Sequence, residues 1–280
     1  MTDTAMTPPA TSSLSAESRT PILALDDVTK AYGTHVALSH ITLSVYAGEV
    51  TCVLGDNGAG KSTLIKTLSG LHKPTEGRVL IDGETVALKS PKDAIARGIS
   101  TVFQDLAVVP DMPVWRNFYL GHEVVRGPNW LGMVAPLDAE HMKKTTDTAL
   151  KSMGIDLPDV TVPISTLSGG QRQVVAIARA VHFGARAIIL DEPTAALGVK
   201  QSGMVLRFVQ QAKERGLGVI LITHNPHHAY LVGDHFVLLG HGRMQLDAGR
   251  QDITLEQLTA QMAGGEELES LSHELGQVRA

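Results

Sequence analysis

The segment Gly55–Ser62 reads GDNGAGKS and follows the apolar run Val50–Leu54. It fits the pattern G-x-x-x-x-G-K-[ST], in which consecutive backbone N–H groups and a helix start face the phosphates of a bound nucleotide. The apolar run predicts a buried strand, and the residues Ser62–Ser69, stopped by Gly70, predict a helix. The alternative is a tight glycine-rich turn without a ligand. The segment therefore predicts a nucleoside triphosphate site between a strand and a helix.

Four residues bring chemistry to that site. Lys61 is placed to neutralise β- and γ-phosphate oxygens, and the hydroxyl of Ser62 is a ligand for Mg²⁺. A second apolar run, Ala187–Leu190, is followed directly by Asp191 and Glu192. Because the carboxyl ends of parallel strands line the ligand crevice, we expect Asp191 to hold the Mg²⁺ shell through water. Glu192 is then placed to orient or deprotonate the attacking water. The alternative for this pair is a solvated strand end.

A third segment, Leu167–Gln171, reads LSGGQ and precedes the second apolar run. A serine hydroxyl and two glycines ahead of a long helical stretch are typical of an anion-binding helix start. The same composition is common in linkers, so this segment alone is weak evidence. Its position between the other two segments makes it informative.

In this order the three segments resemble the ATP-binding-cassette (ABC) ATPases, over residues 22 to about 265. The resemblance implies an α/β fold, a P-loop NTPase core with an antiparallel β subdomain and a helical insertion. It also implies that the LSGGQ segment contacts the γ-phosphate held by the opposite subunit, so that each ATP lies between two chains. Since each motif occurs once, the expected working unit is a dimer with a second ATPase subunit, either a twin or a paralogue.

Three further positions match the family one by one. Tyr32 stands where an aromatic ring stacks on adenine; the alternative is a core residue beside a turn. Gln104 matches the glutamine that contacts Mg²⁺ and the attacking water and leads into the helical insertion. His224, at the end of the apolar run Val219–Thr223, matches the histidine that hydrogen-bonds the γ-phosphate, where the alternative is a structural histidine.

The site expected from motif and resemblance has three parts. The catalytic residues are Glu192, His224 and Gln104, and the Mg²⁺ ligands are Ser62, Gln104 and Asp191. The expected ATP contacts are Tyr32, Gly55, Asp56, Asn57, Gly58, Ala59, Gly60, Lys61, Ser62, Thr63, Ser168, Gly169, Gly170 and Gln171. The other histidines, including His227 and His228, show no metal-ligand pattern with cysteine, and we expect them on the surface or at a helix cap.

One departure from the family lies after Asp191-Glu192-Pro193-Thr194. The family has Ser-Ala-Leu-Asp there, with an Asp that communicates across the dimer, whereas this chain has Ala195-Ala196-Leu197-Gly198. A carboxylate contact is thus absent at position 198. This departure from the family puts the coupling between the two ATP sites in doubt. The residues expected to act on the phosphates and the water are intact.

The rest of the chain has a regular order of elements. Alternating runs predict antiparallel strands at 22–28 and 38–45, with further strands at 77–83 and 99–103. Helices are expected at 114–120 and 139–153, from Gln171 to about 183, and around 205–215. The strands 187–190 and 219–223 should pair in parallel, and 236–239 with 244–246 should form a hairpin around His241-Gly242. The expected divisions are a disordered tail (1–21), the ABC ATPase domain (22–250, insertion about 105–168) and a helical tail (251–280).

The composition predicts a soluble globular protein. The chain has 280 residues, 43% of them hydrophobic, and a formal charge of −5, which gives no basic footprint for nucleic acid. Its apolar runs are strand-length, far below the roughly 20 residues that cross a bilayer. Its start carries no secretory signal. The single cysteine, Cys52, lies in an apolar run and is expected to be a buried, reduced thiol.

Several segments resemble the monosaccharide importers of bacteria within the ABC family: Ser90–Ala94, Val102–Pro110, Leu120-Gly121, Ala195–Lys200 and Met262–Gly265. Ribose- and galactose-type ATPases of that group fuse two cassettes, whereas this chain has the single cassette of the fructose-type subunit. The resemblance therefore implies the ATPase of an importer for fructose or a similar simple sugar. The cassette does not touch the sugar, so the sequence leaves the sugar open.

This assignment implies partners and a location. A transmembrane permease would dock on Leu106–Leu120, a periplasmic sugar-binding protein would take part indirectly, and the chain would lie on the cytoplasmic face of the inner membrane. Pro110, Met112, Pro113 and Trp115 suggest that docking surface, but they could equally fill the insertion's own core. Two alternatives stay open: a non-transport ABC ATPase, and a nucleotide-dependent regulatory protein without turnover.

Overall fold

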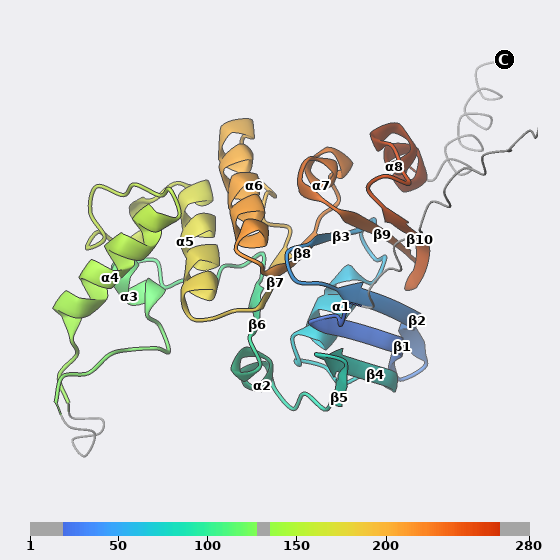
Figure 1. Cartoon of the computed structure of the whole chain (residues 1–280), viewed down its shortest axis with the longest axis horizontal. Coiled ribbons are helices and arrows are strands. Elements are labelled where there is room, and N and C mark those ends of the chain that lie inside the picture. Colours follow the sequence, from blue (N-terminus) through green and yellow to red (C-terminus); the bar gives the residue numbers. More distant parts are fainter. Residues whose placement is uncertain (1–18, 128–134, 264–280) are drawn as a thin grey trace, which may run out of the picture.

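The structure is a computed structural model that describes residues 19–127 and 135–263 (Figure 1). The predicted tails at 1–21 and 251–280 lie mostly outside these residues, as does part of the predicted insertion. The elements are β1 (Leu23–Tyr32), β2 (His35–Val45), β3 (Val50–Leu54), α1 (Lys61–Leu68), β4 (Glu76–Ile81), β5 (Glu84–Val86), α2 (Pro91–Ala96), β6 (Ile99–Val102), α3 (Val114–Phe118), α4 (Ala139–Ser152), the 3-10 turn η2 (Ile164–Thr166), α5 (Gly169–His182), β7 (Ala187–Asp191), α6 (Val199–Glu214), β8 (Gly218–Ile222), α7 (Pro226–Val232), β9 (His235–Gly240), β10 (Arg243–Gly249) and α8 (Leu255–Met262).

Two sheets organise the described residues. The antiparallel sheet has the order β2-β1-β4-β5, and the larger sheet has the order β10-β9-β3-β8-β7-β6. In the larger sheet β9, β3, β8, β7 and β6 are parallel, and β10 joins the edge antiparallel to β9. The strand that precedes the phosphate loop, β3, is thus central, flanked by strands that come from the last third of the chain.

Alternating side chains of the central strands separate two cores. Cys52 and Leu54 of β3 pack with residues of α3 to α8, whereas Val53 packs on the other face with β1, β2, β4 and α1. Because successive residues of a strand point to opposite faces, a continuous apolar run is what a strand between two cores requires. The helix α1 therefore lies between the two sheets, and the loop that leads to it opens at their junction.

Most predicted elements are confirmed, with shifted ends. The antiparallel pairing of β1 with β2 and the parallel pairing of β7 with β8 are as expected. The helix predicted to begin at Gln171 begins at Gly169. Its start is fixed by a capping box, in which the Ser168 hydroxyl accepts from the Gln171 N–H and the Gln171 side chain accepts from the Ser168 N–H. The helix expected at 205–215 begins at Val199. The elements β5, α2 and α7 were not predicted.

The segment predicted as a helical insertion contains α3, α4 and η2 among its described residues. Trp115 is only 8% exposed, and Val114 and Phe118 are fully buried, so α3 packs into the large core that the insertion shares with α5 and the parallel sheet. Of the four residues proposed for docking, Trp115 therefore follows the core alternative, whereas Pro110 is exposed. Within the described part of the chain, no helix is long and apolar enough to cross a membrane.

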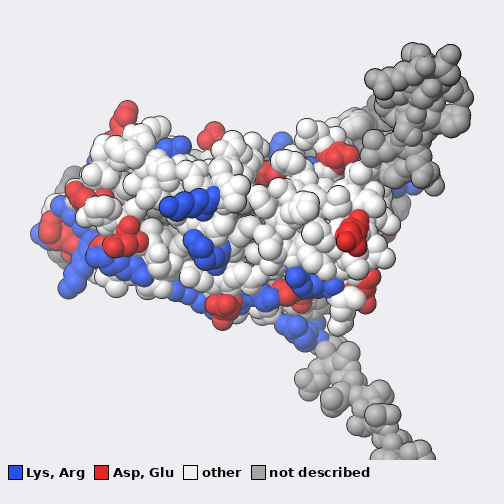
Figure 2. All heavy atoms as spheres, turned by 90° about the horizontal axis from the view of Figure 1, so that it is seen from above, with Lys and Arg blue, Asp and Glu red and all other residues white. Residues whose placement is uncertain are grey.

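The face seen in Figure 2 carries both signs of charge. Lys and Arg side chains are interspersed with Asp and Glu, and uncharged residues separate the groups over much of the surface. On this face the charges form no continuous basic stripe, in keeping with the formal charge of −5.

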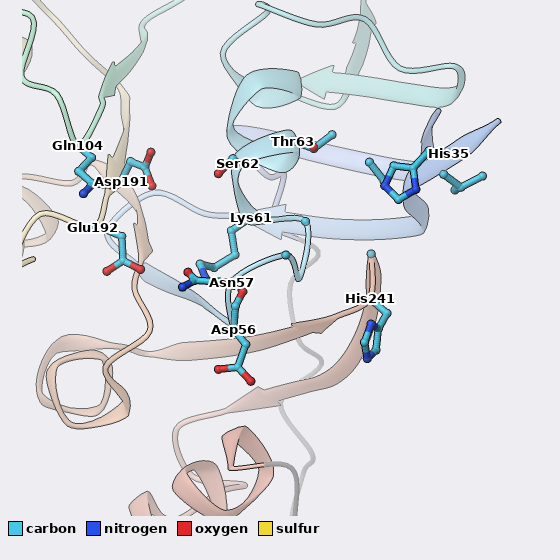
Figure 3. A pocket seen from close by; sticks show the side chains of 15 residues that line it. His35, Asp56, Asn57, Lys61, Ser62, Thr63, Gln104, Asp191, Glu192 and His241 are labelled. Carbon is cyan, nitrogen blue, oxygen red and sulfur yellow. Dashed lines mark hydrogen bonds between the residues drawn. The ribbon is translucent and has the colours of Figure 1, made fainter. Parts of the chain in front are cut away.

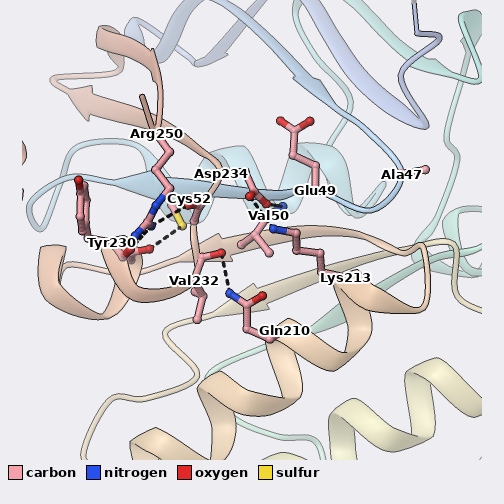
Figure 4. Close-up of polar contacts among 12 residues, drawn as sticks. Ala47, Glu49, Val50, Cys52, Gln210, Lys213, Tyr230, Val232, Asp234 and Arg250 are labelled. Carbon is pink, nitrogen blue, oxygen red and sulfur yellow. Dashed lines mark hydrogen bonds and ion pairs between the residues drawn. The ribbon is translucent and has the colours of Figure 1, made fainter. Parts of the chain in front are cut away.

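A polar cluster ties β3 to the C-terminal half of the chain (Figure 4). The carboxylate of Asp234 accepts a hydrogen bond from the backbone N–H of Val50 at 2.9 Å and pairs with the ammonium of Lys213 at 2.5 Å. The thiol of Cys52 is buried nearby, unpaired with any other cysteine, and its burial raises its pKa. The burial of Cys52 that the sequence predicts is therefore confirmed.

We expect Asp234 to contribute more to stability than Lys213. Asp234→Ala removes both the ion pair and the partner of the Val50 N–H, and should lower the free energy of unfolding by about 2 kcal/mol. Lys213→Ala removes only the half-exposed ion pair and should cost about 1 kcal/mol. Urea unfolding measures both, with Lys151→Ala, which breaks an exposed i,i+4 pair with Asp147, as the control. An equal decrease in the free energy of unfolding of all three variants would contradict this ranking.

Candidate functional site

The phosphate loop is packed tightly on one side and open on the other. Gly55 has a φ of 148°, and a Cβ there would lie 2.4 Å from the carbonyl oxygen of Leu239. Gly60, at a φ of 107°, would bring a Cβ within 2.9 Å of the carbonyl oxygen of Ala37. Gly58 also has a positive φ, 86°, but a Cβ there would meet nothing within 4 Å. Two glycines are thus needed for packing, and the third leaves open space where a ligand can approach the backbone.

Lys61 lies across the loop that precedes it. Its ammonium donates to the carbonyl oxygens of Gly55 at 2.5 Å and Asp56 at 3.0 Å, and the residue is buried. The loop is also closed by the bond from the Ala59 N–H to the Asp56 carbonyl, at 3.1 Å. The positive charge is therefore held at the floor of the loop, next to the backbone that would face phosphates.

A cavity of about 410 Å³ opens over this loop (Figure 3). It brings together three segments that the sequence analysis proposed as one site: the phosphate loop, the residue after β6, and the end of β7. Its lining is His35, Val36, Ala37, Asp56, Asn57, Gly58, Gly60, Lys61, Ser62, Thr63, Gln104, Asp191, Glu192, His241 and Gly242.

Asp191 ends β7 and lies half-buried in the cavity wall. Burial raises the pKa of its carboxyl, and the charge of neighbouring Glu192 raises it further, while Lys61 and Lys66 act in the opposite direction. A half-buried carboxylate beside a second carboxylate is a place where a cation or a proton is favoured. The electrostatics of this wall thus suit a bound cation.

Glu192 is held in an unusual conformation. Its φ is 46°, in the left-handed region, and its backbone N–H donates to the Ile222 carbonyl at 2.9 Å. The Oε1 atom contacts the Nδ1 of exposed His224 at 2.9 Å, whereas Oε2 is buried without a hydrogen-bond partner among the described residues. A buried carboxylate oxygen without a partner normally requires a water or ligand, and such strain is concentrated at functional sites.

Several proposed residues lie outside the cavity lining. Gly55 and Ala59 belong to the packed side of the loop. Tyr32 is 42% exposed at the end of β1, with its ring edge-on to His72 at 5.6 Å and the Lys30 ammonium over it at 5.1 Å, so it is not a core residue. His224 reaches the site only through Glu192. The LSGGQ residues Ser168, Gly169, Gly170 and Gln171 form the first turn of α5 and do not line this cavity.

The cavity also contains residues that the sequence analysis missed. His35, Val36 and Ala37 come from the start of β2, and His241 and Gly242 from the turn between β9 and β10. The motifs give no signal for them, since strand pairing alone brings these segments to the loop. The histidines expected on the surface or at a helix cap lie as expected: His227 is exposed, and His228 lies at the start of α7, where its N–H donates to the N-cap Asn225 at 3.1 Å. The ring of His228 is half-buried and contacts the Thr194 hydroxyl at 3.0 Å.

Gly198, the departure from the family, is the N-cap of α6. It has extended backbone, with φ −69° and ψ 161°, and no side chain to cap the helix. A Cβ there would meet nothing within 4 Å. An aspartate would therefore fit at this position without displacing neighbours, and it would cap the helix.

Comparison with known proteins gives consistent matches. The family profile described as "ABC transporter" matches residues 38–195. The chain is 41% identical to the xylose/arabinose import ATP-binding protein of Sulfolobus acidocaldarius, over 86% of this chain and 93% of that protein. It is 40% identical to the fructose import ATP-binding protein of Rhizobium meliloti, over 88% of this chain and 95% of that protein. A ribose import ATP-binding protein of Rubrobacter xylanophilus is 37% identical over 83% of this chain but only 46% of its own length.

Solved structures agree with these matches. An ATP-binding cassette of an ABC transporter in its ADP conformation superposes with a TM-score of 0.75 at 25% identity, over 89% of this chain and 97% of that one. A second cassette, a dimer in a post-hydrolysis state bound to ADP and Pi, has a TM-score of 0.67 at 28% identity. The match covers 82% of this chain and 100% of that one.

The loop geometry predicts different effects for two glycine substitutions. Gly55→Ala forces a methyl group against a backbone oxygen and should lower stability by about 3 kcal/mol or more. Gly58→Ala adds only left-handed strain, about 1–2 kcal/mol, but places its methyl group in the cavity. We therefore expect Gly58→Ala to fold and to bind ATP weakly, as measured by thermal unfolding and titration calorimetry. Equal stability of the two variants would contradict the packing described here.

Proposed function

The chain belongs to the ABC transporter family, and on that basis we propose that it is the ATP-hydrolysing subunit of an importer for a monosaccharide, fructose or a similar simple sugar. The curated relatives at 40–41% identity are import ATP-binding proteins for xylose/arabinose and for fructose. The chain spans nearly all of both relatives but about half of the ribose protein. The observation that carries the proposal is the one cavity shared by the phosphate loop, Gln104, Asp191 and Glu192.

The proposed chemistry follows from the positions of these side chains. The loop backbone and Lys61 would hold the β- and γ-phosphates, which places the γ-phosphorus near the end of β7. Glu192 would then orient or deprotonate the attacking water, because its Oε2 is buried without a partner among the described residues. His224 would hold Glu192 through the 2.9 Å contact and reach the γ-phosphate from the same side.

The donor set of the cavity fits Mg²⁺. Ser62, Gln104 and Asp191 line the same cavity and offer hydroxyl, amide and carboxylate oxygens, which are the ligands that this hard cation prefers. The raised pKa of Asp191 also supports a bound cation. Burial and the neighbouring Glu192 disfavour the ionised carboxylate, and a cation there would offset that cost. Bound Mg²⁺ would neutralise charge on the β- and γ-oxygens.

The location of the LSGGQ segment supports a two-chain site. Ser168 and Gln171 cap α5 reciprocally, at 3.3 Å and 2.9 Å, which leaves backbone N–H groups of the first helical turn directed outward from the helix start. Since these residues lie outside the cavity, they would act on the ATP of a second ATPase subunit. We propose a homodimer, in which each ATP lies between the loop of one chain and the LSGGQ segment of the other.

A transmembrane permease is the proposed second partner. A hollow of about 250 Å³ separates the insertion from the parallel sheet and is lined by Ala107 and Leu120 of the proposed docking segment, with Ile95, His122 and Arg179 around them. Ile95 is 52% exposed, and Leu120 is 37% exposed. The proposed docking surface is therefore this hollow and not Trp115, and binding to a permease there would hold the chain at the cytoplasmic face of the bacterial inner membrane. A periplasmic sugar-binding protein would act through the permease.

The composite site predicts a nucleotide-dependent dimer. Glu192→Gln should block hydrolysis while the phosphate loop and the Mg²⁺ donors stay intact, so ATP should accumulate between two chains. Because a ligand bound only in the dimer stabilises the dimer, saturating MgATP should shift the variant from monomer to dimer in sedimentation. Adding Ser168→Arg should abolish the shift, and a melting curve must show that this variant folds. A Glu192→Gln chain that binds ATP and stays monomeric would argue for a different partner subunit.

The docking surface predicts a separation of activities. Ile95→Glu and Leu120→Glu place a charge in the proposed docking hollow without touching the nucleotide cavity. We expect both to retain the ATPase activity of the isolated chain and to abolish sugar uptake in cells where they replace the original chain. Leu231→Glu, at an exposed position of α7, is the matched control and should leave uptake intact. Normal uptake with Leu120→Glu would exclude this docking surface.

A further inference from the structure

The loop between β7 and α6 carries two residues in a backbone conformation that they do not favour. Glu192 has a φ of 46° and Ala196 a φ of 58°. Neither glutamate nor alanine is among the residues enriched in this left-handed region, and such residues keep it only where neighbouring contacts impose it. The direction of the Glu192 carboxylate therefore depends on the contacts that hold this loop.

The end of β8 and the start of α7 hold the loop at three points. The Glu192 N–H donates to the Ile222 carbonyl at 2.9 Å, and the Glu192 carboxylate contacts the Nδ1 of His224 at 2.9 Å. The third point is the contact of 3.0 Å between the Thr194 hydroxyl and the Nδ1 of His228. Thr194 is only 7% exposed, and its hydroxyl has no other hydrogen-bond partner among the described residues. The motifs assign a role to His224 but none to His228.

The backbone around His228 is itself fixed to the end of β8. The His228 N–H donates to the side chain of Asn225, the N-cap of α7, at 3.1 Å. The Asn225 N–H in turn donates to the Thr223 hydroxyl at 3.1 Å. Pro226 occupies the first position of the helix, where its fixed φ suits the helical backbone. The imidazole of His228 therefore starts from a rigid helix end, from which it can hold a neighbouring loop in place.

The contact between His228 and Thr194 joins two uncharged groups outside the nucleotide cavity. Burial lowers the pKa of His228, and the nearby His227 and His224 lower it further, so the neutral ring is favoured. A neutral imidazole has one accepting nitrogen, which suits the Thr194 hydroxyl as a donor. Neither residue lines the cavity. Their contact can therefore act on the reaction only through the loop that carries Glu192, and not by touching the nucleotide.

We propose that His228 is a positioning residue for ATP hydrolysis: by holding the Thr194 hydroxyl, it fixes the left-handed loop that directs the Glu192 carboxylate toward the attacking water. This inference rests on the proposed function, because it takes Glu192 as the group that acts on that water. The chemical step depends on the direction of the carboxylate, whereas MgATP binding depends on the phosphate loop. Loss of the contact therefore slows hydrolysis without weakening MgATP binding.

The test measures hydrolysis and binding separately in the full chain. Steady-state ATPase activity gives kcat, and titration calorimetry gives the Kd for MgATP. His228→Ala and Thr194→Val remove the same contact from its two sides. We expect each to lower kcat about tenfold, the scale of one lost hydrogen bond, and to change the Kd by less than about twofold. The double variant should lose no more than either single variant, because both act through one contact.

Conservative variants and a matched control separate positioning from a general effect on the fold. His228→Asn keeps an amide near the position of Nδ1, and Thr194→Ser keeps the hydroxyl, so each should recover most of the lost kcat. His227→Ala removes the exposed histidine next to His228 and should hydrolyse ATP like the original chain. Thermal unfolding shows which variants fold. If His228→Ala does not fold, Thr194→Val, which nearly keeps the shape of the side chain, carries the same test.

The outcomes distinguish this inference from the proposed function. If the folded variants His228→Ala and Thr194→Val keep full kcat, or if kcat and MgATP affinity fall together, the positioning role is wrong while the phosphate site and Glu192 stand. Additive losses of kcat in the double variant would also overturn it. If the original chain does not hydrolyse ATP, the proposed function itself fails.

Discussion

The backbone of the phosphate loop packs so closely on two neighbouring segments that two of its glycines leave no room for a side chain, and the rest of the site depends on this packing. Gly55 lies against the carbonyl of Leu239 in β9, and Gly60 against the carbonyl of Ala37 in β2. Neither neighbour can move away, because each is a backbone atom of a paired strand. The loop, the first hairpin and the last hairpin are therefore one rigid unit. Its two closed sides leave a single open side, and the cavity forms there.

Charge is distributed unevenly along that cavity. At one end the buried strand β7 delivers two consecutive carboxylates, and burial together with their mutual repulsion raises the pKa of Asp191. Glu192 adds a left-handed backbone and an oxygen without a partner among the described residues. These features cost stability in the chain alone and would become favourable with the cation and the triphosphate that we propose for this site. At the other end the lining consists of residues from the start of β2 and from the turn between β9 and β10, among them His35, Ala37, His241 and Gly242. The site is thus polarised before any ligand enters.

Much of this architecture could be predicted from the sequence, and the omissions have physical reasons. Strands such as β3 and β8 were evident because they are apolar along their whole length, as a strand between two cores must be. The short elements β5, α2 and α7 carry too few residues for a periodic pattern. The start of α6 gives a weak signal in the sequence because Gly198 offers no capping side chain and the polar residues Lys200, Gln201 and Ser202 follow Val199. Within the cavity, Lys61, Gln104, Asp191 and Glu192 could be proposed from motifs and resemblance. His35 and His241 could not, since only the pairing of β9 with β3 and of β2 with β1 brings them there.

The position of β3 in the sheet has a consequence for biosynthesis. This strand lies early in the chain, at residues 50–54, but its two neighbours are β8 and β9, at 218–222 and 235–240. A ribosome that has just produced the phosphate loop has produced neither of the strands that hold it, nor the turn that closes it. Such distant pairings are slow to form, and the apolar strand must wait without partners while the next hundred and more residues emerge. Nucleotide can stabilise only the finished arrangement, so it cannot assist at this stage. The nascent chain thus carries its most recognisable motif through most of its synthesis before the strands that flank β3 exist.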